Sequence, residues 1–203
     1  MDEITQIEYF TEEELISCLR GVTMLEDPHC YPYADAEIQL AKITHENLNP
    51  AQRYILTENI GRVQHLQWAI EENGFNIFQL NGFLRMRFDG SDEQVDLLPP
   101  VVEVSDYDDP TRDINIVCDG MHRIYLSYVQ WIVPQVILIR NVPRQYPYYA
   151  YPLKNPSWDA IEIWENIPKD SIKKWHRIEE NKKLYRNFNS TFKNVGAPRG
   201  TGE

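Results

Sequence analysis

The sequence predicts an α+β fold, in which short strands and amphipathic helices share one core. In several places apolar residues alternate or run continuously over four to six positions, which is typical of strands. Elsewhere they recur every three or four residues, which is typical of a helix that packs one face. Hydrophobic residues make up 42% and aromatic residues 12% of the 203 residues, which is enough for an extensive core.

The first predicted helix begins at Thr11 and ends at Gly21. Thr11 and Glu14 have the spacing of a capping box, and the first turn is acidic. A loop rich in Pro and Tyr follows. The alternation over residues 38–43 then predicts the first strand of the sheet.

A second helix is predicted from an N-cap at Thr57 to Asn73-Gly74, because the apolar residues between them fall on one face. Residues 75–88 then predict a hairpin. Its strands would be residues 77–80 and 84–88, joined by the turn-forming pair Asn-Gly.

Apolar runs predict three later strands, at residues 101–104, 114–118 and 135–140. Asp119 and Gly120 follow the second of these, and helical spacing then resumes and continues to Ile132. Backbone N–H groups at a helix N-terminus have no partner within the helix and carry the positive end of its dipole. The sequence therefore predicts an anion site at residues 119–123, called here the 119–123 turn, where Asp119 could hold Mg²⁺ or cap the helix.

Three segments resemble the ParB/sulfiredoxin superfamily. Residues 119–123, Asp-Gly-Met-His-Arg, resemble its phosphate-binding motif. Residues 48–53, Leu-Asn-Pro-Ala-Gln-Arg, resemble its Asn-Pro-X-Gln-X-Arg segment, and residues 98–104 are similar to the strand that pairs with the motif strand. The order and rough spacing agree over about residues 38–140.

The resemblance implies a small mixed sheet with flanking helices over residues 38–141. Residues 1–37 would then be an N-terminal extension with a helix. Residues 142–203 would hold a Tyr- and Pro-rich segment, a basic C-terminal helix from Pro168 to Lys183 and a disordered tail.

The resemblance also implies a set of residues that bind ATP or another nucleotide. They are Gln52, Arg53, Asp119, Gly120, Met121, His122 and Arg123. Asp119 would in addition hold Mg²⁺, and Asp119 and His122 would take part in catalysis.

In family members that phosphorylate free serine, which this motif resembles most, a glutamate after His acts as base for the acceptor hydroxyl. Glu46 matches this context, although the Asn-Pro-X-Gln alignment places Gln52 nearer the equivalent position. A glutamate can accept a proton from an alcohol and a glutamine cannot. The alternative for Glu46 is an ordinary solvated carboxylate.

These features favour a nucleotide-dependent kinase that uses ATP or ADP and acts on a free amino acid or a similar small metabolite. Met121 stands where sulfiredoxins carry a reactive cysteine, which excludes a sulfinic-acid reductase of that kind. Two alternatives remain open. One is a nucleotide-binding switch without catalysis, with a protein partner at the C-terminal extension, and the other is a ParB-like nuclease.

Charge and composition narrow the classes of partner. Residues 169–203 carry nine basic and four acidic residues, so 11 basic and 27 acidic residues remain in the body. An acidic body weighs against nucleic-acid binding, which depends on neutralising phosphates. The chain shows neither a membrane-spanning run nor a signal peptide, and its three cysteines have no paired spacing. We therefore expect a cytoplasmic protein with reduced thiols.

Overall fold

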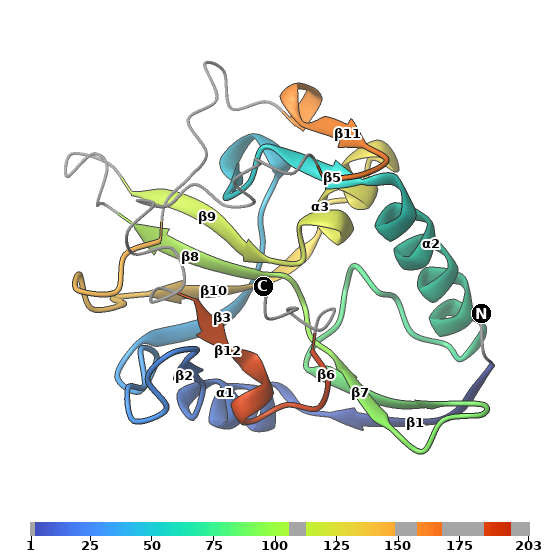
Figure 1. Cartoon of the computed structure of the whole chain (residues 1–203), viewed down its shortest axis with the longest axis horizontal. Helices are drawn as coiled ribbons and strands as arrows, with labels where there is room; N and C mark the ends of the chain where they lie inside the picture. The colour runs from blue at the N-terminus through green and yellow to red at the C-terminus, as the bar shows by residue number, and fades with distance from the viewer. Residues whose placement is uncertain (1–2, 106–112, 149–157, 168–184, 196–203) are drawn as a thin grey trace.

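A five-stranded mixed sheet forms the centre of the molecule (Figure 1). The structure, a computed structural model, describes residues 3–105, 113–148, 158–167 and 185–195. The strands of the sheet, in spatial order, are β3 (Glu37–Lys42), β10 (Gln135–Arg140), β8 (Val101–Ser105), β9 (Ile114–Asp119) and β4 (Asn49–Pro50). β10 is parallel to β8 and β4 is parallel to β9, whereas the pairs β3–β10 and β8–β9 are antiparallel. The four predicted sheet strands and the mixed α+β class are thus confirmed.

The central strands have long apolar runs because both faces of the sheet are covered. Along β10, Ile137 and Ile139 belong to one buried cluster, while Val136 and Leu138 belong to another on the opposite face. The first cluster lies against the N-terminal helix and the second against the helix that follows the 119–123 turn.

The structure contains three α-helices within the described residues, α1 (Glu12–Arg20), α2 (Thr57–Glu72) and α3 (Met121–Val129). The predicted capping box of α1 is present in both directions between Thr11 and Glu14. For α2 the N-cap is Leu56, so the predicted cap at Thr57 is one residue late.

Helix α3 ends at Val129, before the predicted end at Ile132. Trp131 adopts a left-handed backbone conformation with φ of 59°. The Ile132 N–H then donates to the Ser127 carbonyl at 2.9 Å, which satisfies a carbonyl at the end of the helix. Periodicity did not reveal this stop because Ile132 still packs against the buried cluster beside α2.

A second, antiparallel sheet lies beside the first and contains β1 (Ile4–Phe10), β6 (Phe83–Phe88) and β7 (Gln94–Leu97). The described chain thus starts with a strand that was not predicted, and the predicted first helix follows it as α1. The predicted hairpin is also wrong, since β6 pairs with β1 and β7 and not with residues 77–80. Residues 77–80 form no strand, although the side chains of Ile77, Phe78 and Leu80 are buried.

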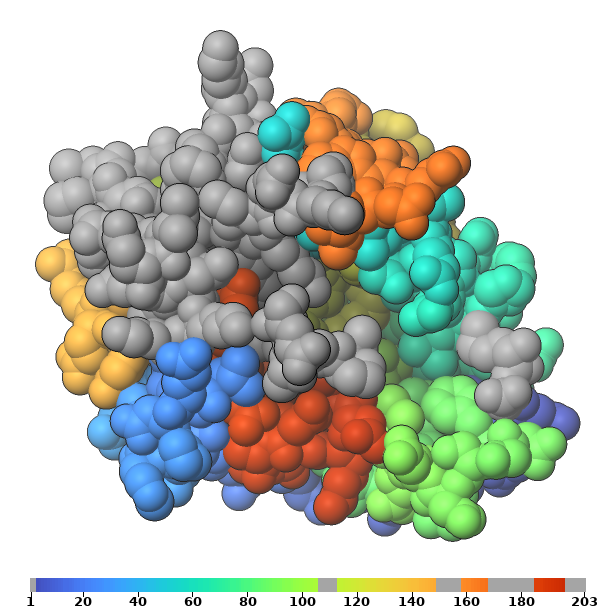
Figure 2. All heavy atoms as spheres, in the orientation of Figure 1, coloured from blue at the N-terminus to red at the C-terminus, as the bar shows by residue number. Residues whose placement is uncertain are grey.

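Two short ladders tie distant segments together. β2 (Thr23–Met24) pairs with β12 (Arg186–Asn187), and β5 (Tyr54–Leu56) pairs in parallel with β11 (Glu162–Trp164). Three 3₁₀ turns complete the described elements, η1 (His45–Asn47), η2 (Trp158–Ala160) and η4 (Phe188–Ser190). In Figure 2 the red residues that include β12 and η4 lie between the blue N-terminal region and the green region around β7.

The predicted C-terminal helix and tail fall outside the described residues. No disulfide joins the three cysteines in the structure. Among the described helices, none combines the length and apolar character needed to cross a bilayer.

Candidate functional site

Gly120 forms the junction between β9, which ends at Asp119, and α3, which begins at Met121. Its φ of 83° lies in the left-handed region that favours glycine. A Cβ at this position would lie 2.8 Å from Cβ and 2.9 Å from Cα of Pro100. The tight turn and the close approach of Pro100 therefore both require glycine here.

Helix α3 presents its N-terminus directly after this turn. The first hydrogen bond of the helix runs from the Ile124 N–H to the Gly120 carbonyl at 3.0 Å. The preceding N–H groups of the first turn have no acceptor within the helix, and the helix dipole adds positive potential there. Met121 itself is only 4% exposed and packs in the core, so its side chain contributes packing and its backbone contributes to the turn.

Arg123 braces the turn from within the protein. Its Nη1 donates to the Leu98 carbonyl, and its Nη2 lies 3.7 Å from Oδ2 of Asp119. Burial lowers the pKa of the Arg123 guanidinium, and the Asp119 carboxylate opposes that effect. The structure thus places the Arg123 charge beneath the turn, whereas the motif suggested a guanidinium that grips phosphate oxygens directly.

His122 links the turn to the end of β5. Its Nε2 accepts a hydrogen bond from the Leu56 N–H at 3.1 Å. A ring nitrogen that accepts in this way carries no proton, so the proton of the neutral ring is on Nδ1. This hydrogen bond fixes the His122 ring beside the 119–123 turn, at the end of β5.

The segment of residues 48–53 lies beside the strand that leads into the 119–123 turn. In the ladder between β4 and β9, Asn49 is paired with Ile116 and Pro50 with Val117. The side chain of Gln52 is buried and its Nε2 donates to the Tyr54 carbonyl at 2.7 Å. Gln52 therefore shapes the chain between β4 and β5 in this structure.

The Arg53 side chain contacts two residues of β11. Its Nη2 lies 2.6 Å from Oε1 of Glu162, and its guanidinium carbon lies 6.0 Å from the centre of the Trp164 ring. The contact that the structure shows for this charge is thus with β11 and not with the 119–123 turn.

Glu46 is exposed in η1, where Oε1 accepts a hydrogen bond from the Thr44 hydroxyl at 3.0 Å. The neighbouring His45 has Nε2 2.9 Å from Oγ of Ser127. Ser127 is six residues beyond the first residue of α3, or about 9 Å along the helix axis. The structure thus places η1 beside the second half of α3 and does not bring Glu46 to the turn.

Asp119 is the predicted Mg²⁺ ligand, and its side chain is 25% exposed at the turn. Mg²⁺ bound with a nucleotide commonly takes one or two protein carboxylates together with phosphate oxygens and water. A single carboxylate beside the backbone N–H groups at the start of α3 is compatible with that pattern. In the parts of the chain that the structure describes, no group of three or more His, Cys, Asp or Glu side chains could hold a metal ion.

Sequence reasoning missed a buried polar cluster that includes Glu103 of β8 and contacts Cys118, the residue before the turn. It contains Tyr33, Glu103, Tyr148 and Arg186. The signal was present, because Glu103 interrupts an otherwise apolar strand, and a charge at such a position needs a buried partner. The partner could not be identified because Arg186 lies 83 residues further along the chain.

A comparison with protein families found one match, to the model described as the ParB CE domain, over residues 14–162. No curated protein and no solved structure matched the chain in the corresponding comparisons. The family match covers most of the chain, including the 119–123 turn, the segment around β4 and both helices beside them. The chain therefore belongs to the ParB CE domain family.

Proposed function

We propose that the protein binds a nucleotide through its phosphates at the 119–123 turn and transfers a phosphoryl group to the hydroxyl of a free amino acid or a similar small metabolite. The observation that carries the proposal is Gly120, whose left-handed conformation lets α3 begin directly at the end of a buried strand. That arrangement lets backbone N–H groups approach an anion closely.

Three side chains complete the proposed site. The His122 ring, held at the end of β5 by the Leu56 N–H, contributes to phosphate binding in this proposal. The buried charge of Arg123 adds positive potential beneath the turn, and Asp119 holds the Mg²⁺ that neutralises phosphate charge. Glu46 accepts the proton of the acceptor hydroxyl in this proposal.

Calorimetric titration with MgATP, MgADP and MgCTP tests nucleotide binding. Asp119→Asn and His122→Ala should each weaken binding by roughly tenfold or more, because each removes a charge-assisted contact. Asp89→Asn and His29→Ala are matched controls at exposed positions and should bind as the wild type does. Equal affinities in all five proteins, or no binding by the wild type, would contradict the proposal.

Phosphoryl transfer is tested with γ-labelled ATP, and β-labelled ADP, in the presence of free amino acids and small alcohols. Glu46→Gln should lose turnover and keep the nucleotide affinity of the wild type. Glu58→Gln, an exposed glutamate that pairs with Arg62 on α2, is the control and should keep both. Transfer by Glu46→Gln at the wild-type rate would remove Glu46 from the mechanism.

A nucleotide-binding module without catalysis is the second candidate. The exposed position of Glu46, away from the turn, favours it. It predicts binding that depends on Asp119 and His122 without transfer to any acceptor. A ParB-like nuclease remains a third alternative, and it would require several carboxylates that converge on metal.

A further inference from the structure

Glu103, in the middle of β8, is the centre of a buried polar cluster. Its Oε1 accepts from Nε of Arg186 at 2.9 Å and from the Tyr33 hydroxyl at 2.6 Å, and its Oε2 accepts from Nη2 of Arg186 at 2.7 Å. Both charges are almost completely buried, so each needs the other. Arg186 is thereby fixed in position against the central sheet.

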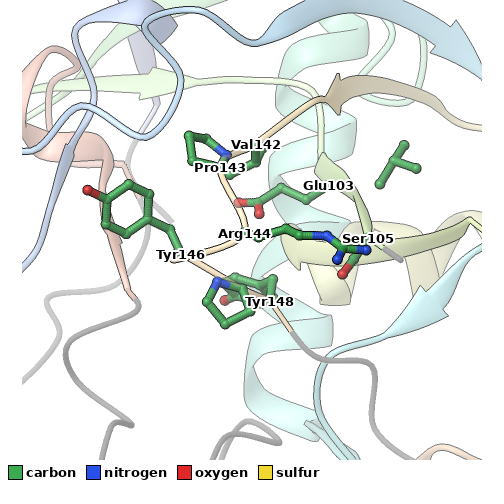
Figure 3. A pocket seen from close by; sticks show the side chains of 9 residues that line it. Glu103, Ser105, Val142, Pro143, Arg144, Tyr146 and Tyr148 are labelled. Carbon is green, nitrogen blue, oxygen red and sulfur yellow. The ribbon is translucent and has the colours of Figure 1, made fainter. Parts of the chain in front are cut away.

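Arg186 in turn holds the segment that follows β10. Its Nη2 also donates to the Tyr146 carbonyl at 2.8 Å, and its guanidinium carbon lies 5.2 Å from the centre of the Tyr148 ring. Figure 3 looks into the hollow beside this segment, which is lined by Glu103 and Ser105 from β8 and by Tyr146 and Tyr148 from the chain after β10. The Tyr148 side chain is thus placed by Arg186.

Tyr148 reaches the strand that leads into the 119–123 turn. Its buried hydroxyl donates to the Cys118 carbonyl at 3.3 Å. Cys118 immediately precedes Asp119. A continuous set of contacts therefore runs from Glu103 through Arg186 and Tyr148 to the residue before the turn.

The pairing of β8 and β9 shows why this contact matters. Val101 is paired with Asp119 and Val102 with Val117, so Cys118 is an extra residue on β9. Such a β-bulge bends its strand and leaves the extra residue outside the regular ladder. Tyr148 supplies a hydrogen bond to the carbonyl of this extra residue, at the point where the chain changes direction.

We propose that Tyr148 and Arg186 are positioning residues for the 119–123 turn. Tyr148 fixes the bulge at Cys118, Arg186 holds Tyr148 in place, and together they set the orientation of Asp119 and of the first N–H groups of α3. The effect on nucleotide affinity rests on the proposed function, whereas the effect on the rigidity of the turn does not.

Tyr148→Phe is the sharpest test, because it removes the hydroxyl and keeps the ring beside Arg186. Hydrogen exchange of the amides of residues 119–124 should become roughly fivefold faster, which corresponds to the loss of one hydrogen bond. MgATP affinity should fall by a similar factor. Arg186→Lys, which keeps the charge and loses the bidentate geometry, should change both quantities in the same direction.

The control uses a second, partly buried ion pair, which contacts the same C-terminal segment through Lys193. Nε and Nη2 of Arg85 each lie 2.8 Å from Asp96, whose Oδ2 also accepts from the Lys193 N–H at 2.9 Å. This pair belongs to the sheet of β6 and β7 and has no contact in the set that leads to Cys118. Asp96→Asn should therefore lower overall stability without accelerating exchange in the turn relative to the rest of the chain.

The outcomes separate the two proposals. Faster exchange in the turn of Tyr148→Phe, but not in that of Asp96→Asn, supports the positioning role. This holds even if the wild type binds no nucleotide. The absence of nucleotide binding would overturn the proposed function and not the positioning role. Unchanged exchange in Tyr148→Phe, or an equal acceleration in Asp96→Asn, would overturn the positioning role.

Discussion

Arg186 and Glu103 form a bidentate ion pair in which the side chains are 1% and 3% exposed. Burial alone would lower the pKa of Arg186, but the Glu103 carboxylate raises it above its ordinary value, so the guanidinium stays charged. Burial, together with the charge of Glu103, likewise raises the pKa of Tyr33, whose hydroxyl stays protonated and donates to the carboxylate.

Removing one partner of this pair should lower the free energy of unfolding far more than replacing both partners. Arg186→Met leaves Glu103 as an uncompensated buried charge and should lower the free energy of unfolding by about 3–5 kcal/mol. Combining it with Glu103→Leu replaces both charges by apolar groups and should recover a large part of that loss. Urea unfolding followed by circular dichroism measures both, and a double variant no more stable than Arg186→Met would contradict the prediction.

Gly120→Ala should destabilise the protein more than Gly90→Ala. Both glycines have positive φ, 83° and 72°, so the left-handed conformation of alanine at either position should lower the free energy of unfolding by about 1–2 kcal/mol. Only at Gly120 would the new Cβ also meet Pro100, and overpacking of this kind costs about 1–3 kcal/mol more. The difference in unfolding free energy between the two variants isolates the contact, and equal losses would show that Pro100 can move aside.

His45 should make stability depend on pH. Burial lowers the pKa of His45 below its ordinary value, and the Glu46 carboxylate partly opposes this. The unfolded chain, with a histidine pKa of about 6.5, then takes up the proton at a higher pH than the folded protein does. The free energy of unfolding should therefore fall as pH falls through about 6.5 and the lowered pKa of the folded state.

Comparison of the wild type with His45→Gln at several pH values between about 7.5 and 5 separates this contribution from those of the carboxylates. The stability difference between the two proteins should shift in favour of the variant as pH falls. His29→Gln, at an exposed position, is the control and should follow the wild type. A pH-independent difference for His45→Gln would contradict the prediction.

Thr11→Ala should lower the free energy of unfolding by about 1 kcal/mol, because it removes the side-chain acceptor of the α1 capping box. Thr57→Ala is the matched comparison, since α2 has no side-chain N-cap bond and Thr57 is already its first helical residue. It should cost less than Thr11→Ala. Thermal or urea unfolding of both variants checks the order, and a reversed order would mean that the caps are wrongly assigned.

Local patterns were sufficient to predict the central elements. The strands β3, β8, β9 and β10, the capping box of α1 and the junction at Gly120 all depend on short stretches with strong apolar or turn signals. The family resemblance correctly predicted that residues 98–104 pair with the motif strand, as the ladder between β8 and β9 shows.

Features that depend on distant partners could not be predicted in this way. β1 was missed because its partly buried positions recur every third residue and do not alternate, and the strand it pairs with, β6, lies more than seventy residues further on. The same reason explains the false hairpin, since Ile77 and Phe78 look like strand residues but are buried by tertiary packing. The buried orientation of Arg123 was missed because its acceptor is a backbone carbonyl, that of Leu98, which no side-chain pattern reveals.

The position of Arg186 near the end of the chain has a consequence for how the protein folds. A growing chain that has emerged only as far as β10 contains Glu103 without its partner, and the ring of Phe192 is still absent from its place against Phe83. Pairings between residues so far apart close late, because chain entropy must be lost before they contribute. We therefore expect the ribosome-bound chain to remain incompletely packed until Arg186 and Phe192 have emerged from the ribosome, and a protein cut at the boundary of the family match to resemble that unfinished state.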